Sequence, residues 1–315
     1  MKKISIIVPC FNEEETVELF YLAVVKEISN ITNYEFEIIF VDDGSKDNTL
    51  LRLEKLSLCD PIVNYVSFSR NFGKEAAIFC GLKEANGDAV IVIDADLQHP
   101  VSLIHDMITQ WENGSDVVEG IKSTRGKERV LYKIFSKIFY SCMSHFLGFD
   151  MQNTSDYKLL DRKVVNSMNN LQERMTFFRA LSFWVGFNSS KVEYDVEDRI
   201  GGKSKWSSKS LIKYAIYNIT SFTYAPLHLI IWTGVFVIII AIFCGIDVLV
   251  GIAMEKSVAG YPTLVFLILM STGACMLSMG VLSLYVSRMY EEIKSRPRYI
   301  VMKRNCNNSS DNREY

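Results

Sequence analysis

The sequence has few of the residues that build disulfide frameworks or zinc sites. Its seven cysteines are scattered and form no Cys-x-x-Cys pair, and its four histidines do not cluster. An odd, dispersed set of cysteines is typical of reduced thiols, so we expect no disulfide framework. The histidines give no zinc-ligand spacing, so we expect no zinc site.

A basic excess is also missing. The chain carries 34 Lys and Arg against 36 Asp and Glu, which gives a formal net charge of −2. Domains that bind nucleic acid normally carry strong positive charge, so we expect no nucleic-acid partner. A signal peptide is not apparent either, because the first apolar stretch is short and is followed by Pro9 and three acids. This stretch indicates a first strand instead.

The first hundred residues alternate between strand-like and helix-like segments. Short runs rich in Ile and Val predict strands at 4–9, 37–42, 64–68 and 89–96. Helical segments are predicted between them at 13–30, 46–58 and 73–86. Apolar runs of this length suit parallel strands that are covered on both faces. The alternation therefore predicts an α/β domain with a mostly parallel sheet.

Polar residues close each of these strands. They are Asn12 and Glu13, Asp42 and Asp43, Arg70 and Asn71, and Asp94 and Asp96. Ligands of parallel sheets bind beyond the carboxyl ends of the strands, so we expect these side chains to converge on one rim.

The stretch "VIDADLQHP" (92–100) ends a predicted strand with two acids. Residues two apart in an extended chain point the same way, so Asp94 and Asp96 repel each other unless a cation lies nearby. Two carboxylates with Gln98 suit a hard divalent cation such as Mg²⁺ or Mn²⁺.

The C-terminal third is strongly apolar. Segments 227–251 and 262–287 are each long enough to cross a bilayer core of roughly 30 Å, which predicts a transmembrane hairpin. Lys and Arg flank its outer ends, so the positive-inside rule predicts that both termini and the α/β domain face the cytoplasm. Residues 129–147 have amphipathic helical spacing, which suits either an ordinary surface helix or a helix on a membrane surface.

Several motifs occur in an order that resembles a known family. They are "IIVPCFNEEE" (6–15), "VDDGSKDNT" (41–49), "SRNFGKEAA" (69–77), "VIDADLQHP" (92–100), "DYKLLDRKVV" (156–165), "GGKSKW" (201–206) and "YEEIKSRPRYIV" (290–301). Together they are similar to the polyprenyl-phosphate glycosyltransferases of glycosyltransferase family 2, the group of bactoprenol glucosyltransferases and dolichol-phosphate mannosyltransferases. The resemblance covers nearly all of the chain except its last residues.

The resemblance implies a GT-A type nucleotide-sugar-binding domain over 1–206, a juxtamembrane amphipathic helix over 207–226, the two spans, and a cytoplasmic tail over 288–315. It also implies a binding site for the nucleotide-sugar formed by Pro9, Phe11, Asn12, Glu13, Asp42, Asp43, Ser45, Arg70, Lys74 and Asp94. Arg70 and Lys74 either contact the phosphate or sugar or pair with a nearby acid. The metal ligands would be Asp94, Asp96 and Gln98, and the catalytic residues Asp96 and Asp156.

The implied acceptor is undecaprenyl phosphate, which accounts for the membrane hairpin. Candidate residues for its phosphate are Arg125, Arg129, Lys133, Lys203 and Lys205, although charges before a span also serve as plain anchors. The sequence departs from the family pattern at Ser155, at Tyr157 and Lys158, and at Ala180, which puts the shape of the sugar pocket in doubt. Family membership is also consistent with a homo-oligomer such as a tetramer.

The expected activity is metal-dependent, inverting transfer of one sugar from a UDP-sugar to undecaprenyl phosphate at the cytoplasmic membrane face. Glucose is the first choice, followed by N-acetylglucosamine, mannose from GDP, and aminoarabinose. A processive synthase is disfavoured because "QERMTF" (172–177) lacks the QxxRW signature of such enzymes. A non-catalytic membrane adaptor with a degenerate transferase domain is the alternative from another class.

Overall fold

The computed structural model describes residues 1–122, 154–171, 177–194, 225–254 and 260–305. The chain divides into two compact units. One unit combines residues 1–206 with residues 297–315, and the other comprises residues 207–296. The first unit therefore contains residues that precede the second unit in the sequence and residues that follow it.

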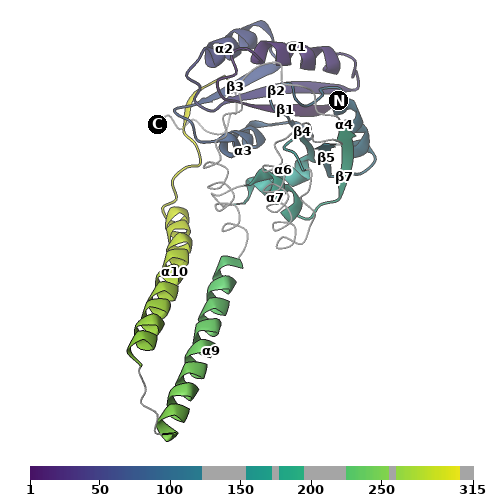
Figure 1. Ribbon diagram of the computed structural model, residues 1–315. Helices are drawn as coiled ribbons and strands as arrows, with labels where there is room; N and C mark the ends of the chain where they lie inside the picture. Colours follow the sequence, from purple (N-terminus) through teal and green to yellow (C-terminus); the bar gives the residue numbers. More distant parts are fainter. Residues whose placement is uncertain (123–153, 172–176, 195–224, 255–259, 306–315) are drawn as a thin grey trace. The chain divides into compact units, whose positions relative to one another are not determined.

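An eight-stranded sheet forms the centre of the first unit (Figure 1), in the order β7-β5-β6-β4-β1-β2-β3-β8. The strands are β1 Lys2–Cys10, β2 Tyr34–Asp42, β3 Val63–Phe68, β4 Ala89–Val92, β5 Val117–Lys122, β6 Lys158–Asp161, β7 Ser189–Tyr194 and β8 Val301–Arg304. Strands β3, β2, β1 and β4 are mutually parallel, whereas β6 and β8 pair antiparallel with their neighbours. The prediction of an α/β fold with a mostly parallel sheet is confirmed.

Helices cover both faces of this sheet. They are α1 Val17–Ile28, α2 Thr49–Cys59, α3 Lys74–Glu84, α4 Leu103–Glu112, α6 Arg162–Asn169 and α7 Phe178–Trp184. Alternate residues of β1, such as Ile4 and Ile6, pack in one core with α1, α2 and α4. Ile7 points to the other face, where Gly81 of α3 lies so close that an added Cβ would sit 2.3 Å from the Ile7 side chain. Both faces of β1 are thus buried, as its near-continuous apolar run predicted.

Strand β4 is shorter than predicted, because it ends at Val92 and not at Asp96. The amide of Ile93 still donates to the carbonyl of Ile7 at 3.0 Å. The next rung would need an amide hydrogen from Pro9, which proline lacks. Asp94 and Asp96 therefore lie in a turn beyond the strand, and the expectation that they share one face of an extended strand is wrong.

The second unit contains two long helices, α9 Ala225–Ala253 and α10 Tyr261–Ile293. The predicted spans 227–251 and 262–287 lie inside them. Among the described residues, one helical stretch is long and apolar enough to cross a membrane, Met270–Ser287, whereas the apolar stretch of α9, Ile230–Phe243, is shorter. A membrane-crossing hairpin accordingly stays a proposal, which is taken up below.

Candidate active site

The site lies at the carboxyl ends of the central parallel strands, where the order β3-β2-β1-β4 places the switch point between β1 and β4. The loops after β1 and β2 are tied together there. The Asn12 amide donates to Ser45 Oγ, and the Lys46 amide donates to Asn12 Oδ1, both at 2.8 Å. Asn12 takes a left-handed backbone conformation with φ of 54°, which asparagine tolerates better than most residues. These bonds fix the polar loops into one rim.

The two acids at the end of β2, Asp42 and Asp43, have different hydrogen-bond partners. Asp42 accepts hydrogen bonds from the Ser45 amide at 3.0 Å and from Ser67 Oγ at 2.7 Å. Asp43 accepts from the backbone amides of Phe72 and Gly73, at 2.6 Å and 2.9 Å. Burial raises the pKa of Asp43 to about 6, although these two amides oppose the shift. Asp43 thus holds the loop before α3, and its predicted contact with a nucleotide stays a prediction.

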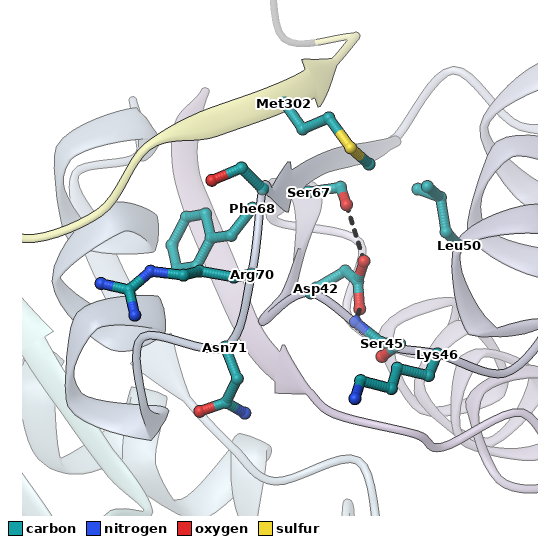
Figure 2. A pocket seen from close by; sticks show the side chains of 11 residues that line it. Asp42, Ser45, Lys46, Leu50, Ser67, Phe68, Arg70, Asn71 and Met302 are labelled. Carbon is teal, nitrogen blue, oxygen red and sulfur yellow. Dashed lines mark hydrogen bonds between the residues drawn. The ribbon is translucent and has the colours of Figure 1, made fainter.

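A cavity of about 280 Å³ opens between the turn after β2 and the loop after β3 (Figure 2). Gly44 allows these two segments to approach each other, because its φ is +66° and an added Cβ would lie 2.4 Å from the carbonyl carbon of Arg70. The lining includes three residues predicted to bind the nucleotide-sugar, Asp42, Ser45 and Arg70. The guanidinium of Arg70 lies over the Phe72 ring, with 4.5 Å between Cζ and the ring centroid.

Four charged side chains form a second cluster on the rim. Lys74 Nζ lies 2.6 Å from Asp94 Oδ1 and 2.6 Å from Asp156 Oδ2, so it bridges the two acids. The Arg179 guanidinium donates two hydrogen bonds to the Asp156 carboxylate, from Nε at 2.7 Å and from Nη2 at 2.9 Å. Of the two tasks that the sequence left open for Lys74, pairing with an acid is thus the one seen in the structure.

The charges in this cluster set each other's protonation. Burial disfavours the ionised form of Asp94, but Lys74 and His99 outweigh it and hold the pKa of Asp94 below its ordinary range. Burial also disfavours the ionised form of Asp156, but Arg179 and Lys74 outweigh this effect. They hold the pKa of Asp156 well below its ordinary value. Burial lowers the pKa of Lys74, yet Asp156 and Asp94 raise it overall. Both acids are therefore ionised at neutral pH, and Asp156 is a poor proton acceptor.

A histidine and a tyrosine complete the surroundings of Asp94. Nε2 of the buried His99 lies 3.6 Å from Asp94 Oδ2, and its Nδ1 lies 2.6 Å from the Tyr194 hydroxyl oxygen. Because β7 contributes Tyr194, the far edge of the sheet helps to orient an acid at its centre.

Asp96 and Gln98 lie in the turn that follows Asp94. The Gln98 amide donates to Asp96 Oδ1 at 3.2 Å, and Leu97 between them has a positive φ of 57°, an uncommon backbone conformation for leucine. Among the described residues, no three His, Cys, Asp or Glu side chains form a group that could hold a metal ion. Mg²⁺ is often bound by only one or two carboxylates together with substrate phosphates, and Asp96 with the Gln98 amide oxygen fits that donor set.

The predicted site residues divide into two groups. The structure brings the loop residues after β1, β2, β3 and β4 to one rim, together with Asp156. The five candidates for the lipid phosphate, Arg125, Arg129, Lys133, Lys203 and Lys205, and the amphipathic segment 129–147, lie outside the described residues.

Sequence reasoning missed Arg179, His99, Tyr194 and Met302 as residues of the site. A buried acid such as Asp156 needs a cationic partner, but no local pattern indicates that Arg179 is that partner. Met302 had no signal in the sequence, since it reaches the cavity only through the pairing of β8 with β3.

Comparisons with known proteins give consistent matches. The family model described as Glycosyl transferase family 2 matches residues 5–175. The SfII prophage-derived bactoprenol glucosyl transferase of Shigella flexneri is 39% identical over 303 residues, covering 96% of this chain and 98% of that protein. The putative glycosyltransferase CsbB of Bacillus subtilis is 38% identical over 307 residues, covering 97% and 93%. Among solved structures, glucosyl-3-phosphoglycerate synthase from Mycobacterium tuberculosis with Mn²⁺ and UDP-glucose has a TM-score of 0.49 at 19% identity, covering 70% of this chain and 79% of that one.

Proposed function

The chain belongs to glycosyl transferase family 2 and is a glycosyltransferase, and we propose that it moves one sugar, glucose as first choice, from a UDP-sugar to undecaprenyl phosphate. The observation that carries this proposal is the extent of the match to bactoprenol glucosyl transferases. It covers 96% of the chain, so it includes the helical unit as well as the rim. The reaction would occur at the cytoplasmic face of the membrane and invert the sugar's anomeric carbon.

The donor would lie along the rim. Uracil and ribose offer N–H and O–H donors, and the ionised acids on this rim supply acceptors. The diphosphate would lie near Asp96 and Gln98, where a bound Mg²⁺ or Mn²⁺ would offset charge on the departing nucleotide. Asp94 is engaged by Lys74, so its place among the metal ligands depends on whether Lys74 moves when the donor binds.

The acceptor needs orientation more than deprotonation. A phosphate monoester has a second pKa of about 6, so it is mostly dianionic at neutral pH. Lys74 and Arg179 place two cations beside the acids, and Asp156 holds both of them. We therefore give Asp156 a positioning task in this proposal: it fixes the cations that would meet anionic substrate, and it does not remove a proton.

The pairing of β8 supports a hairpin that crosses the bilayer twice. Residues 1–206 and 297–305 belong to one compact unit, and β8 is hydrogen-bonded to β3. A single crossing between them would leave β8 and β3 on opposite sides of the membrane, so the number of crossings must be even. With two long helices between residues 207 and 296, two crossings satisfy this requirement.

The test is sugar transfer by membranes that contain the protein. Membranes are incubated with a panel of labelled nucleotide-sugars (UDP-glucose, UDP-N-acetylglucosamine, GDP-mannose and a nucleotide-linked aminoarabinose), and lipid-linked product is extracted. We expect labelled lipid from UDP-glucose. Product from another donor would change the sugar, and binding of a UDP-sugar without any product would favour a non-catalytic adaptor.

The metal site has its own prediction. Asp96→Ala should reduce transfer at least about 100-fold while the protein still inserts in the membrane and folds, because it removes the carboxylate next to the diphosphate. Asp106→Ala, on the exposed side of α4, is the matched acid control and should keep full activity. Full activity of Asp96→Ala, or of the unmodified protein in excess EDTA, would refute the metal's role.

A further inference from the structure

The cavity beside Asp42 has one wall that comes from the far end of the chain. Met302 lies on β8 and lines this cavity, although all the other lining residues lie between Asp42 and Asn71 in the sequence. Figure 2 shows its side chain extending from β8 toward the side of Leu50, above Ser67 and Asp42. The Met302 side chain is 59% exposed, so it is accessible to a molecule that enters the cavity.

A β-bulge aims this side chain. Phe68 is paired with Val301 and Ser67 with Lys303, so Met302 is the extra residue between two rungs. Bulges of this kind re-aim a side chain and recur next to active sites. In a regular antiparallel ladder, Phe68 would pair with Met302 and not with Val301.

Contacts on both sides of Met302 hold β8 in place. Before it, the Ile300 carbonyl accepts from the Ser69 amide at 3.0 Å, and the Tyr299 ring stacks on Phe68 with centroids 4.8 Å apart. After it, Asn305 Oδ1 accepts from the Tyr65 amide at 2.6 Å. The backbone of β8 is therefore held on both sides of Met302.

One ion pair connects β8 to α2. Lys303 Nζ lies 2.6 Å from Glu54 Oε1 of α2. Glu54 is one helical turn after Leu50, which lines the same cavity, so the two side chains share a face of α2. The pair thereby links the strand that carries Met302 to the helix face that carries Leu50.

The chemistry of this cavity suits a flat heteroaromatic ring. Leu50 and Met302 supply apolar side chains to the lining, whereas the Phe68 side chain is fully buried, and the thioether of methionine makes favourable contacts with aromatic rings. Asp42 lies at the polar side, and its two accepted bonds leave room for a further donor, because a carboxylate has about four acceptor sites. A pyrimidine base has an apolar face for the first group and an N–H edge for the second.

We infer that β8 forms one wall of the nucleobase site and that Met302 packs against the face of the base. This inference rests on the proposed function, since it assumes that the donor is a nucleoside diphosphate sugar. It adds a residue that determines donor affinity and lies beyond the segment matched by the family model, which ends at residue 175.

The experiment measures equilibrium binding to the full-length protein in detergent with Mg²⁺, using labelled UDP and unlabelled inorganic pyrophosphate as competitor. Met302→Ala should raise the Kd for UDP about three- to tenfold, whereas pyrophosphate, which has no base, should compete as it does in the unmodified protein. Met302→Leu should recover most of the affinity. Ile300→Ala is the matched control, because Ile300 is 52% exposed on the same segment and contributes only its backbone carbonyl to the contacts above.

Each outcome decides the inference. An unchanged Kd for UDP in Met302→Ala would overturn it, and so would an equal loss of UDP and pyrophosphate binding, which would indicate general damage to the fold. If the unmodified protein binds GDP and not UDP, the uridine donor of the proposed function is overturned, and the same variants measured with GDP still decide the role of Met302. Binding of neither nucleotide would overturn both proposals.

Discussion

At the scale of single residues, Gly44 is the position where the rim depends most on the absence of a side chain. Gly44→Ala should be destabilising because its backbone is left-handed, which costs roughly 1–2 kcal/mol, and should also force apart the turn after β2 and the backbone of Arg70. We expect weaker UDP binding together with a lower unfolding temperature.

Gly114 offers a matched control for this substitution. Its φ is +96°, but an added Cβ would meet no atom within 4 Å. Gly114→Ala should therefore lose stability from backbone strain alone and bind UDP normally. If both variants bind UDP as the unmodified protein does, the close approach at Gly44 does not shape the donor site.

At the scale of elements, α3 and α7 are joined by Glu75, which accepts from the Phe178 amide at 2.8 Å. Burial and the nearby Asp156 raise the pKa of Glu75 to about 8, although the Phe178 amide opposes the shift. The native state thus keeps a proton that the unfolded chain loses at its ordinary pKa of about 4.3. Stability should fall as pH rises through this window and level off above about pH 8.

Glu75→Gln tests this link because it keeps the acceptor and removes the charge. Between pH 6.5 and 9 the unfolding temperature of the unmodified protein should fall by several degrees more than that of the variant, at about 3 °C per kcal/mol. The window starts at 6.5 because Asp43, with a pKa raised to about 6, contributes below it. Parallel pH curves for the two proteins would show that Glu75 titrates normally.

Strands whose two faces are both buried were predictable from the sequence. Strands β1, β2 and β3 are buried on both faces, so their apolar runs marked them, and their polar ends located the rim. β6 was hidden because one of its four residues is Lys158, buried in an ion pair with Glu119 at 3.0 Å. β8 was hidden because it is a short edge strand that exposes three of its four residues.

Within the candidate site, the sequence indicates which loops meet but not which side chains pair with each other. The convergence of strand ends follows from the topology of a parallel sheet, so the sequence predicted which loops meet. The bridge from Lys74 to Asp156 and the grip of Arg179 on that acid depend on how α3 and α7 pack, which no local pattern records. The end of β4 could have been predicted from the sequence, because Pro9 has no amide hydrogen to donate in the next hydrogen bond between β1 and β4.

At the scale of the whole molecule, the chain leaves the sheet unit after residue 206 and returns to it at residue 297. The predicted tail over 288–315 therefore includes a strand of the sheet, β8, which carries the wall that we propose for the donor site. Whether or not the helices cross a membrane, both ends of the helical unit must reach the same compact unit. That constraint allows the chain between residues 206 and 297 to cross a membrane twice or not at all, and it excludes a single crossing.

Cysteine labelling distinguishes these two cases. Cys59 is an exposed thiol of the sheet unit, and position 256 lies between α9 and α10 in the sequence. In chains that keep a single cysteine, at residue 59 or as Lys256→Cys, two crossings predict labelling from opposite sides. A membrane-impermeant maleimide should label Lys256→Cys in right-side-out vesicles and Cys59 in inverted ones, because positive charge flanks the outer ends of the spans.

Detergent-opened vesicles, where both positions should react, control for the accessibility of each thiol. Labelling of both positions from the same side would mean that the helices do not cross, and the acceptor would then have to be reached from the membrane surface.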